Sequence, residues 1–235
     1  MGQILLVRHA QASFGSADYD RLSALGVEQA RLLGAWIASR GRRIDLTVTG
    51  NLKRHCQTAE ACIAVLPAEL KPAAAWRSEA GFDEYDADEI LLRHRPEFAD
   101  PARLQRHLDE GGNPRRAFHG LFSTAMRRWM QGAHDAEYRE SWKAFCGRCV
   151  AALNRVVEQA GPSRTGIVFT SGGPIAAICQ HLLELPDHRA FDLNVSLVNG
   201  AVTGLLYQRG RISVSYFNNF AYLEQTGDAR VITYR

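Results

Sequence analysis

The chain has 235 residues, of which 46% are hydrophobic and 23% charged, and its formal net charge at pH 7 is +3. This length and apolar content suit one sizeable domain whose core needs neither metal ions nor disulfide bonds. The small excess of positive charge is scattered along the chain, which argues against a dedicated nucleic-acid binder.

The cysteines and the apolar runs indicate where such a protein resides. Five cysteines, an odd number without framework spacing, indicate a reducing compartment. No stretch reaches the roughly 20 apolar residues of a membrane span, and the run before Arg8 is too short for a signal peptide. We expect a cytoplasmic protein that binds neither nucleic acid nor membranes, and the sequence carries no signal for its oligomeric state.

The first predicted elements alternate between strand and helix. Residues 4–7 are apolar without alternation, which is typical of a strand buried on both faces. A helix is predicted from the N-cap Ser23 to a stop at Gly41, with apolar residues at helical spacing. A second strand is predicted over residues 44–49, and Asn51 is expected to cap the helix that follows it.

The middle of the chain has a different composition. Residues 73–77 are a weaker candidate for a third strand. Residues 86–139 contain strong helix formers, few β-branched residues, and breaks at Pro96, Pro101 and the Gly-Gly-Asn-Pro stretch 111–114. We interpret this segment as a helical insertion, or cap, within a single domain that spans residues 1–235.

The last third returns to alternation. A long helix is predicted over residues 140–159, with Gly161-Pro162 as its end. It contains the C-x-x-C pair Cys146 and Cys149, which we interpret as part of a buried helix face because no second Cys/His pair lies nearby to form a metal or redox site. A strand at 167–170 then runs into a Ser-Gly-Gly-Pro turn and a further helix.

Two closing strands complete the predicted fold. Residues 201–207 and 212–217 suggest a hairpin joined at Arg209-Gly210. The whole pattern predicts an α/β fold, a three-layer α/β/α sandwich with a mostly parallel sheet and helices on both faces.

Residues suited to binding an anion follow three of the predicted strands. Arg8-His9 ends the first strand, Arg54 opens the helix after the second, and residues 171–174 lead into a helix. Guanidinium groups and helix N-termini both bind phosphate oxygens well. Ligands of open α/β sheets bind at the carboxyl ends of the strands, so these segments are expected to form one anion site.

The N-terminal part of the sequence contains three motifs: LVRHAQA at residues 6–12, LSALGVEQA at 22–30 and LKRHCQTA at 52–59. Together they resemble the histidine phosphatase (phosphoglycerate mutase-like) superfamily. The resemblance continues through the Ser-Gly-Gly turn to Asn219 and Leu223, and it covers most of the chain except the insertion.

This resemblance implies a two-step reaction on a small phosphorylated substrate, without a metal ion or other cofactor. His9 would attack phosphorus and form a phosphohistidine, while Arg8 and Arg54 hold the equatorial oxygens. A carboxylic acid would protonate the leaving oxygen and then activate water. Glu84, in the acidic stretch 82–86, fits the family's pattern best, with Glu79 as the second choice.

Gln11 and Ser13 follow the nucleophile, where the family often contacts its substrate. As bare residues they equally suit polar positions in a loop. They are candidates for substrate binding on the strength of the resemblance alone.

The chain departs from the family at Ser171, which stands where a second histidine usually opens a His-Gly-Gly motif. A serine hydroxyl can still donate a hydrogen bond to the phosphoryl group, but it carries no charge. His55, directly after Arg54, is a candidate to take over the missing donor role; the alternative is an ordinary, partly buried helix histidine.

Hydrolysis of a phosphate monoester is the leading prediction. Two alternatives stay open: mutase-like phosphotransfer, which the departures at Ser171 and Ala10 disfavour, and a degenerate member that binds a phosphorylated ligand or protein without turnover.

Overall fold

The strands form a single mixed sheet in the computed structural model, which describes residues 1–13, 20–72 and 75–234. Its order is β3-β2-β4-β1-β5-β6. The first four strands in this order run parallel, whereas β5 is antiparallel to β1 and β6 to β5. The strands are β1 (Gly2–Arg8), β2 (Leu46–Thr49), β3 (Arg77–Ser78), β4 (Thr165–Thr170), β5 (Val202–Gln208) and β6 (Arg211–Asn219).

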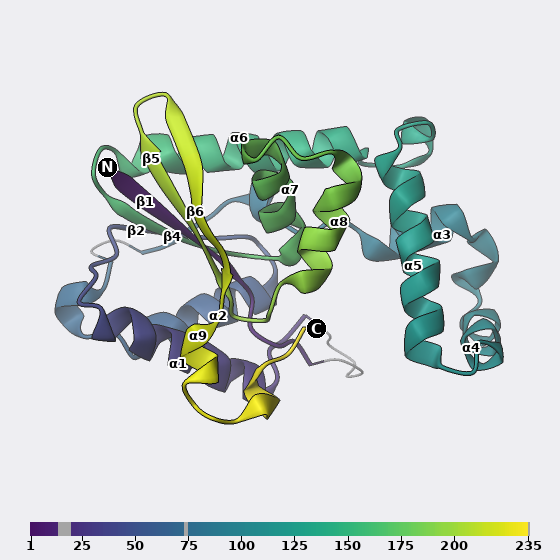
Figure 1. The fold of residues 1–235 in the computed structure, drawn as a ribbon, viewed down its shortest axis with the longest axis horizontal. Helices are drawn as coiled ribbons and strands as arrows, with labels where there is room; N and C mark the ends of the chain where they lie inside the picture. The colour runs from purple at the N-terminus through teal and green to yellow at the C-terminus, as the bar shows by residue number, and fades with distance from the viewer. Residues whose placement is uncertain (14–19, 73–74, 235) are drawn as a thin grey trace.

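Helices cover both faces of this sheet, as the sequence predicted (Figure 1). One core lies under α1, α2 and α9, and the other under α6 and α7. The central strand β1 serves both, because Leu5 and Val7 point into the first core and Ile4 and Leu6 into the second. These helices are α1 (Ala24–Ser39), α2 (Lys53–Ala64), α6 (Trp142–Ala160), α7 (Gly172–Leu182) and α9 (Ala221–Glu224).

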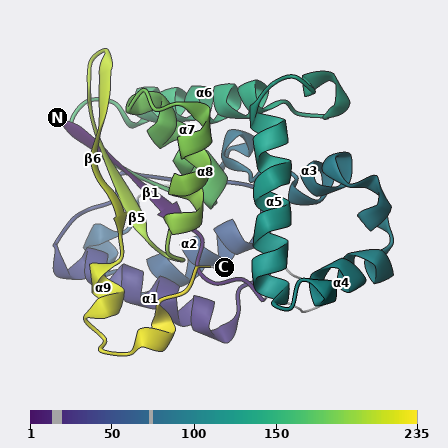
Figure 2. The ribbon, with the colours of Figure 1, turned by 45° about the vertical axis from the view of Figure 1, so that its right-hand side comes forward.

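Helices α3, α4 and α5 project from one end of the sheet, beside α8 (Figures 1 and 2). They fall inside the predicted insertion, and their bounds are α3 (Ala87–His94), α4 (Pro101–Glu110) and α5 (Pro114–Met130), with α8 at Asp187–Ser196. A small core of their own contains Leu91, Phe98 and Leu121. The later half of α5 instead packs into the larger core through Met126 and Trp129. A shared core suits a single domain with an insertion, and that division stays a prediction.

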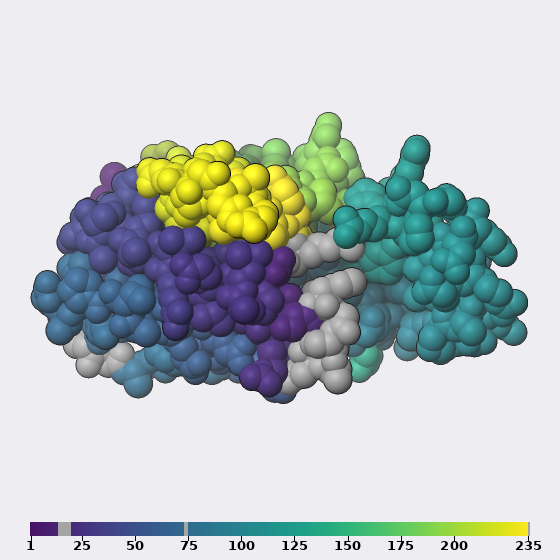
Figure 3. Space-filling view, turned by 90° about the horizontal axis from the view of Figure 1, so that it is seen from below, coloured from purple at the N-terminus to yellow at the C-terminus, as the bar shows by residue number. Residues whose placement is uncertain are grey.

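The C-terminal segment lies across α1 on the face seen from below, and the insertion protrudes at the end of the molecule (Figure 3). Helix α9 contacts α1 there. Within the described residues, none of the helices is long and apolar enough to cross a membrane.

Three local predictions need correction. Leu52, not Asn51, is the N-cap of α2, and the Asn51 side chain instead bonds to Asp83 and Ser78. The second strand starts at Leu46, two residues later than predicted. The third strand is the two-residue edge strand β3, which pairs with β2; residues 73–74 of the predicted strand lie outside the described residues.

Helix α6 and the strands β4, β5 and β6 lie within two residues of their predicted bounds, whereas α8 and α9 had no prediction of their own. Ser141 caps α6, and Gly161 ends it in a left-handed conformation. Cys149 is fully buried on this helix, and burial raises the pKa of Cys146 to about 12. Cys146 is only partly buried, and both thiols are free.

Candidate active site

His9 follows β1 directly and is almost completely buried, with 5% of its surface exposed. Its backbone is held on two sides: its N–H donates to the Thr170 carbonyl at 2.7 Å, and the Asn199 amide donates to the His9 carbonyl at 3.2 Å. These contacts fix the residue at the carboxyl ends of β1 and β4.

The ring of His9 is oriented for attack through Nε2. Its Nδ1 lies 2.8 Å from the Ala10 carbonyl oxygen, which can only accept, so Nδ1 carries the proton. The lone pair is therefore on Nε2. Burial lowers the pKa of His9 well below its usual value, and the charges of Arg54 and Arg8 lower it further. The imidazole is neutral, as a nucleophile must be.

Arg54 lies in the first turn of α2 and is held by Asp20, a residue that the sequence analysis missed. Its Nη1 is 2.6 Å from Asp20 Oδ1, while Asp20 Oδ2 accepts from the Lys53 backbone N–H at 2.9 Å. One carboxylate thus orients the guanidinium and caps a free N–H of the helix. The contact joins residues 34 positions apart, and no local sequence pattern predicts it.

Arg8 ends β1 and is held by two backbone carbonyls. Its guanidinium donates to Leu197 O, just after α8, and to Tyr234 O at 3.1 Å. A Cβ added at Gly172 would lie 3.7 Å from Arg8 Nε, so Arg8 is beside the N-terminus of α7. A guanidinium and a helix N-terminus here both favour an anion.

Glu84 is placed with these groups. Its Oε2 accepts from the Gly173 N–H at 3.3 Å, and a Cβ at Gly173 would lie 2.0 Å from Oε1, so a side chain there would displace the carboxylate. Burial raises the pKa of Glu84, while the charges of Arg54 and Arg8 partly oppose this rise. A raised pKa keeps more of the acid form available for proton donation.

Glu79, the second choice for the acid, is engaged elsewhere. Both of its oxygens bond to Arg155, each at 3.0 Å, and it also accepts from Gly81 N–H. The hydrogen bond from Arg155 is the main cause of its lowered pKa. A carboxylate held in an ion pair is a poor proton donor, so the geometry favours Glu84.

Ser171 and His55 are in direct contact. Ser171 precedes α7, His55 lies in the first turn of α2, and both are fully buried. The Ser171 Oγ is 2.7 Å from His55 Nε2, and the rings of His55 and His9 are 5.9 Å apart between centroids. Burial, helped by the charge of Arg54, lowers the pKa of His55 to about 3, so this ring is neutral too.

Gln11 and Ser13 brace the loop after the nucleophile. The Gln11 side chain accepts from Ser23 Oγ at 2.7 Å, and its backbone N–H donates to Gln29 Oε1 at 2.8 Å. The Ser13 N–H donates to the Arg21 carbonyl at 2.7 Å. These bonds tie the loop to the start of α1; substrate contact by either side chain stays a prediction.

Thr58 lies in the motif at residues 52–59, and its hydroxyl connects two segments of the site. Its hydroxyl accepts from Ala10 N–H at 3.1 Å and donates to the Arg54 carbonyl at 2.6 Å. It therefore links the nucleophile's loop to the helix that carries Arg54. Asn199, which supports His9, had no sequence signal at all.

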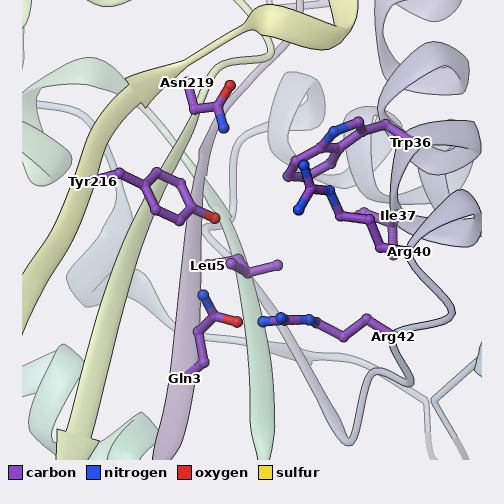
Figure 4. Close-up of a pocket in the computed structure, with 8 residues that line it drawn as sticks. All are labelled: Gln3, Leu5, Trp36, Ile37, Arg40, Arg42, Tyr216 and Asn219. Atoms are coloured by element: carbon purple, nitrogen blue, oxygen red, sulfur yellow. The ribbon is translucent and has the colours of Figure 1, made fainter.

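The two C-terminal residues of the resemblance do not join this group. Asn219 lines a small pocket of about 70 Å³ with Trp36, Arg40 and Tyr216 (Figure 4), and its Oδ1 accepts from the Ala221 N–H at the start of α9. Leu223 is fully buried in the core under α1. Asn219 and Leu223 therefore contribute to the packing of the fold.

Comparison with known proteins shows which family the chain belongs to. The family model for the histidine phosphatase superfamily (branch 1) matches residues 4–115 and 110–220. No curated protein sequence matches the chain.

Several solved structures share the fold at low sequence identity. Phosphoserine phosphatase from Entamoeba histolytica, in complex with 3-phosphoglyceric acid, has a TM-score of 0.64 and 16% identity, covering 95% of this chain and 100% of that one. Phosphoglycerate mutase from Bacillus anthracis has a TM-score of 0.63 and 16% identity, covering 96% of both chains. A putative alpha-ribazole-5'-P phosphatase from Escherichia coli has a TM-score of 0.61 and 15% identity, covering 93% and 98%. The family match spans most of the sequence, and the chain belongs to the histidine phosphatase superfamily.

Proposed function

We propose that the chain hydrolyses a phosphate monoester through a phosphohistidine intermediate on His9. The observation that carries this proposal is the state of the His9 ring: Nδ1 donates to Ala10, so the lone pair on Nε2 lies among the charges of Arg8 and Arg54. A binding protein has no need for a neutral imidazole held in this tautomer.

In the first step, Nε2 of His9 forms a bond to phosphorus and the bond from phosphorus to the leaving oxygen breaks. Arg8 and Arg54 stabilise the charge on the equatorial oxygens. Glu84 gives its proton to the leaving oxygen, so the alcohol departs neutral. The hydrogen bond from Nδ1 to the Ala10 carbonyl stabilises the positive charge that develops on the ring.

In the second step, the Glu84 carboxylate takes a proton from water, whose oxygen then attacks phosphorus. The nitrogen–phosphorus bond breaks, inorganic phosphate is released, and His9 and Glu84 return to their starting states. Glu84 thus acts as acid and then as base, for which a pKa raised toward the working pH is suited.

The arginines supply the charge neutralisation that a metal ion supplies in other phosphoryl-transfer enzymes, so we propose a metal-independent reaction in the cytoplasm. A small phosphorylated substrate is supported by the E. histolytica protein of the same fold, which was crystallised with phosphoserine and with 3-phosphoglyceric acid. We favour hydrolysis over mutase activity because Ala10 and Ser171 depart from the family's pattern.

The test is hydrolysis of p-nitrophenyl phosphate from about pH 5 to about pH 8, with and without chelator. His9→Ala is compared with wild type and with His181→Ala, an exposed histidine at the end of α7. We expect activity that survives the chelator, vanishes in His9→Ala and persists in His181→Ala. Activity that needs a metal ion, or that His9→Ala retains, would contradict the proposal.

A further inference from the structure

The contact between Ser171 and His55 lies beside His9, and the steps proposed above give it no role. Ser171 Oγ and His55 Nε2 are 2.7 Å apart and fully buried. Although Ser171 is the N-cap of α7, its side chain makes no capping hydrogen bond. In the described part of the chain, His55 is the hydroxyl's one hydrogen-bond partner.

The surroundings of His55 indicate which ring nitrogen carries its proton. Nδ1 is buried and has no hydrogen-bond partner among the described residues. A buried N–H without an acceptor is rarer in proteins than a buried acceptor without a donor. The proton therefore belongs on Nε2, from which it is donated to Ser171 Oγ.

This assignment leaves the Ser171 proton available to another acceptor. A hydroxyl has one O–H and two lone pairs, and His55 uses one of the lone pairs. The neighbouring Thr170 carbonyl accepts from the His9 backbone N–H at 2.7 Å, and the Gly173 N–H, two residues on, bonds to Glu84. No other described group accepts the Ser171 proton, so an oxygen of an anion at the N-terminus of α7 would be its acceptor.

We propose that His55 is a positioning residue: its Nε2–H holds the Ser171 hydroxyl, so that the O–H donates to a phosphoryl oxygen in the transition state. This inference rests on the proposed function and refines the sequence-based hypothesis that His55 itself is the donor. No proton is transferred in the pair. A neutral serine, aligned by a neutral histidine, stands where the family usually has a second histidine.

The test uses variants that separate the two ring nitrogens. His55→Gln places an amide N–H near the position of Nε2, whereas the shorter His55→Asn places it near Nδ1. Ser171→Ala removes the donor. Two readouts are taken for each: kcat and KM on p-nitrophenyl phosphate, and the affinity for orthovanadate, which mimics the transition state, relative to inorganic phosphate. Thermal unfolding confirms that each variant is folded.

We expect Ser171→Ala to lower kcat by on the order of a hundredfold, with KM little changed. His55→Asn should lower kcat by on the order of tenfold, as loss of a supporting partner commonly does, and His55→Gln should restore most of it. The double variant Ser171→Ala/His55→Asn should be no slower than Ser171→Ala. Both substitutions act on the same hydrogen bond, from the Ser171 hydroxyl to the phosphoryl oxygen. The affinity for orthovanadate relative to phosphate should fall most in Ser171→Ala, less in His55→Asn and least in His55→Gln.

Two results would overturn the inference alone: losses that multiply in the double variant, or a vanadate preference that Ser171→Ala and His55→Asn leave unchanged. A wild-type protein that binds neither vanadate nor phosphate would instead overturn the proposed function, and the inference with it.

Discussion

At the scale of single residues, the positions of two protons set the chemistry of the site. The Ala10 carbonyl fixes the proton of His9 on Nδ1, and the unpartnered, buried Nδ1 of His55 places the proton of that ring on Nε2, toward Ser171. The carboxyl groups of Glu84 and Glu79, five residues apart, have different surroundings. Glu84 is buried beside the N-terminus of α7, whereas Glu79 is paired with Arg155.

Replacement of Glu84 tests its double role. With p-nitrophenyl phosphate the leaving group needs little protonation, so Glu84→Gln should still form the phosphohistidine but hydrolyse it slowly. We expect a burst of nitrophenol in stopped flow and a steady rate lower by roughly a hundredfold or more. With an alkyl phosphate, whose leaving oxygen must be protonated, the wild-type kcat/KM should fall as pH rises through the raised pKa of Glu84, because the acid form is lost. Glu84→Gln should lack this decline.

Glu79→Gln is the matched control, since it loses the ion pair with Arg155 but should keep turnover near the wild-type value. A larger loss in Glu79→Gln than in Glu84→Gln would reverse the assignment of the acid.

Much of the site could be predicted from the sequence because His9, Arg54 and Ser171 sit at strand ends or helix starts, where position along the chain implies position in space. Asp20 and Asn199 could not be predicted in this way. They reach their partners across 34 and 190 positions, and only the folded chain brings them together.

At the scale of elements, predictions held where apolar periodicity was strong and failed where tertiary contacts outweighed local propensity. The long helix α6 was predicted to within two residues at each end, and the four predicted residues of the buried strand β1 all lie within it. Asn51 has the chemistry of an N-cap, but Asp83 binds it instead. Strand β3 is an exposed edge of two residues, and so short a strand leaves little pattern to detect.

Helix α5 packs the insertion against the main core, together with Ile90 of α3, and Trp129 is the most deeply packed residue of α5 in the aromatic cluster there. This residue is 1% exposed, packs against Trp142 and Phe145, and donates to the Glu140 carbonyl at 2.8 Å. Trp129→Ala should lower the free energy of unfolding by about 3–5 kcal/mol, as large-to-small core substitutions do. Urea denaturation, followed by circular dichroism, measures the loss.

Leu104→Ala, in the partly buried cluster of the insertion, is the comparison and should cost less. For a single domain, both variants should unfold in one cooperative transition. A separate, earlier transition in Leu104→Ala would show that residues 86–139 fold as a unit of their own.

At the scale of the whole molecule, the two neutral histidines of the site should lower the free energy of unfolding at low pH. His9 and His55 are both neutral in the fold at pH values where the unfolded chain protonates them. Their folded pKa values lie below the unfolded value, so the unfolded state binds more protons as pH falls from about 6.5. Stability from these groups is complete above that pH and is lost toward the folded pKa, which for His55 is about 3.

Between about pH 6.5 and about pH 5, His55 alone should lower the free energy of unfolding by about 2 kcal/mol. The raised pKa of Glu84 acts in the opposite direction, so the difference between wild type and His55→Gln isolates the histidine. We expect urea denaturation to give a shallower pH dependence for His55→Gln than for wild type, whereas the exposed His181→Ala should leave the slope unchanged. Equal slopes in wild type and His55→Gln would mean that His55 is protonated in the folded protein.

The central claim is that His9 carries the phosphoryl group, and the most direct measurement is to trap it there. The enzyme is mixed with p-nitrophenyl phosphate, quenched within milliseconds in alkali, where phosphohistidine is stable, and digested for mass spectrometry. We expect phosphate on His9, in larger amount in Glu84→Gln. Turnover with no phosphohistidine in either protein, or phosphate on His55 instead, would contradict the account.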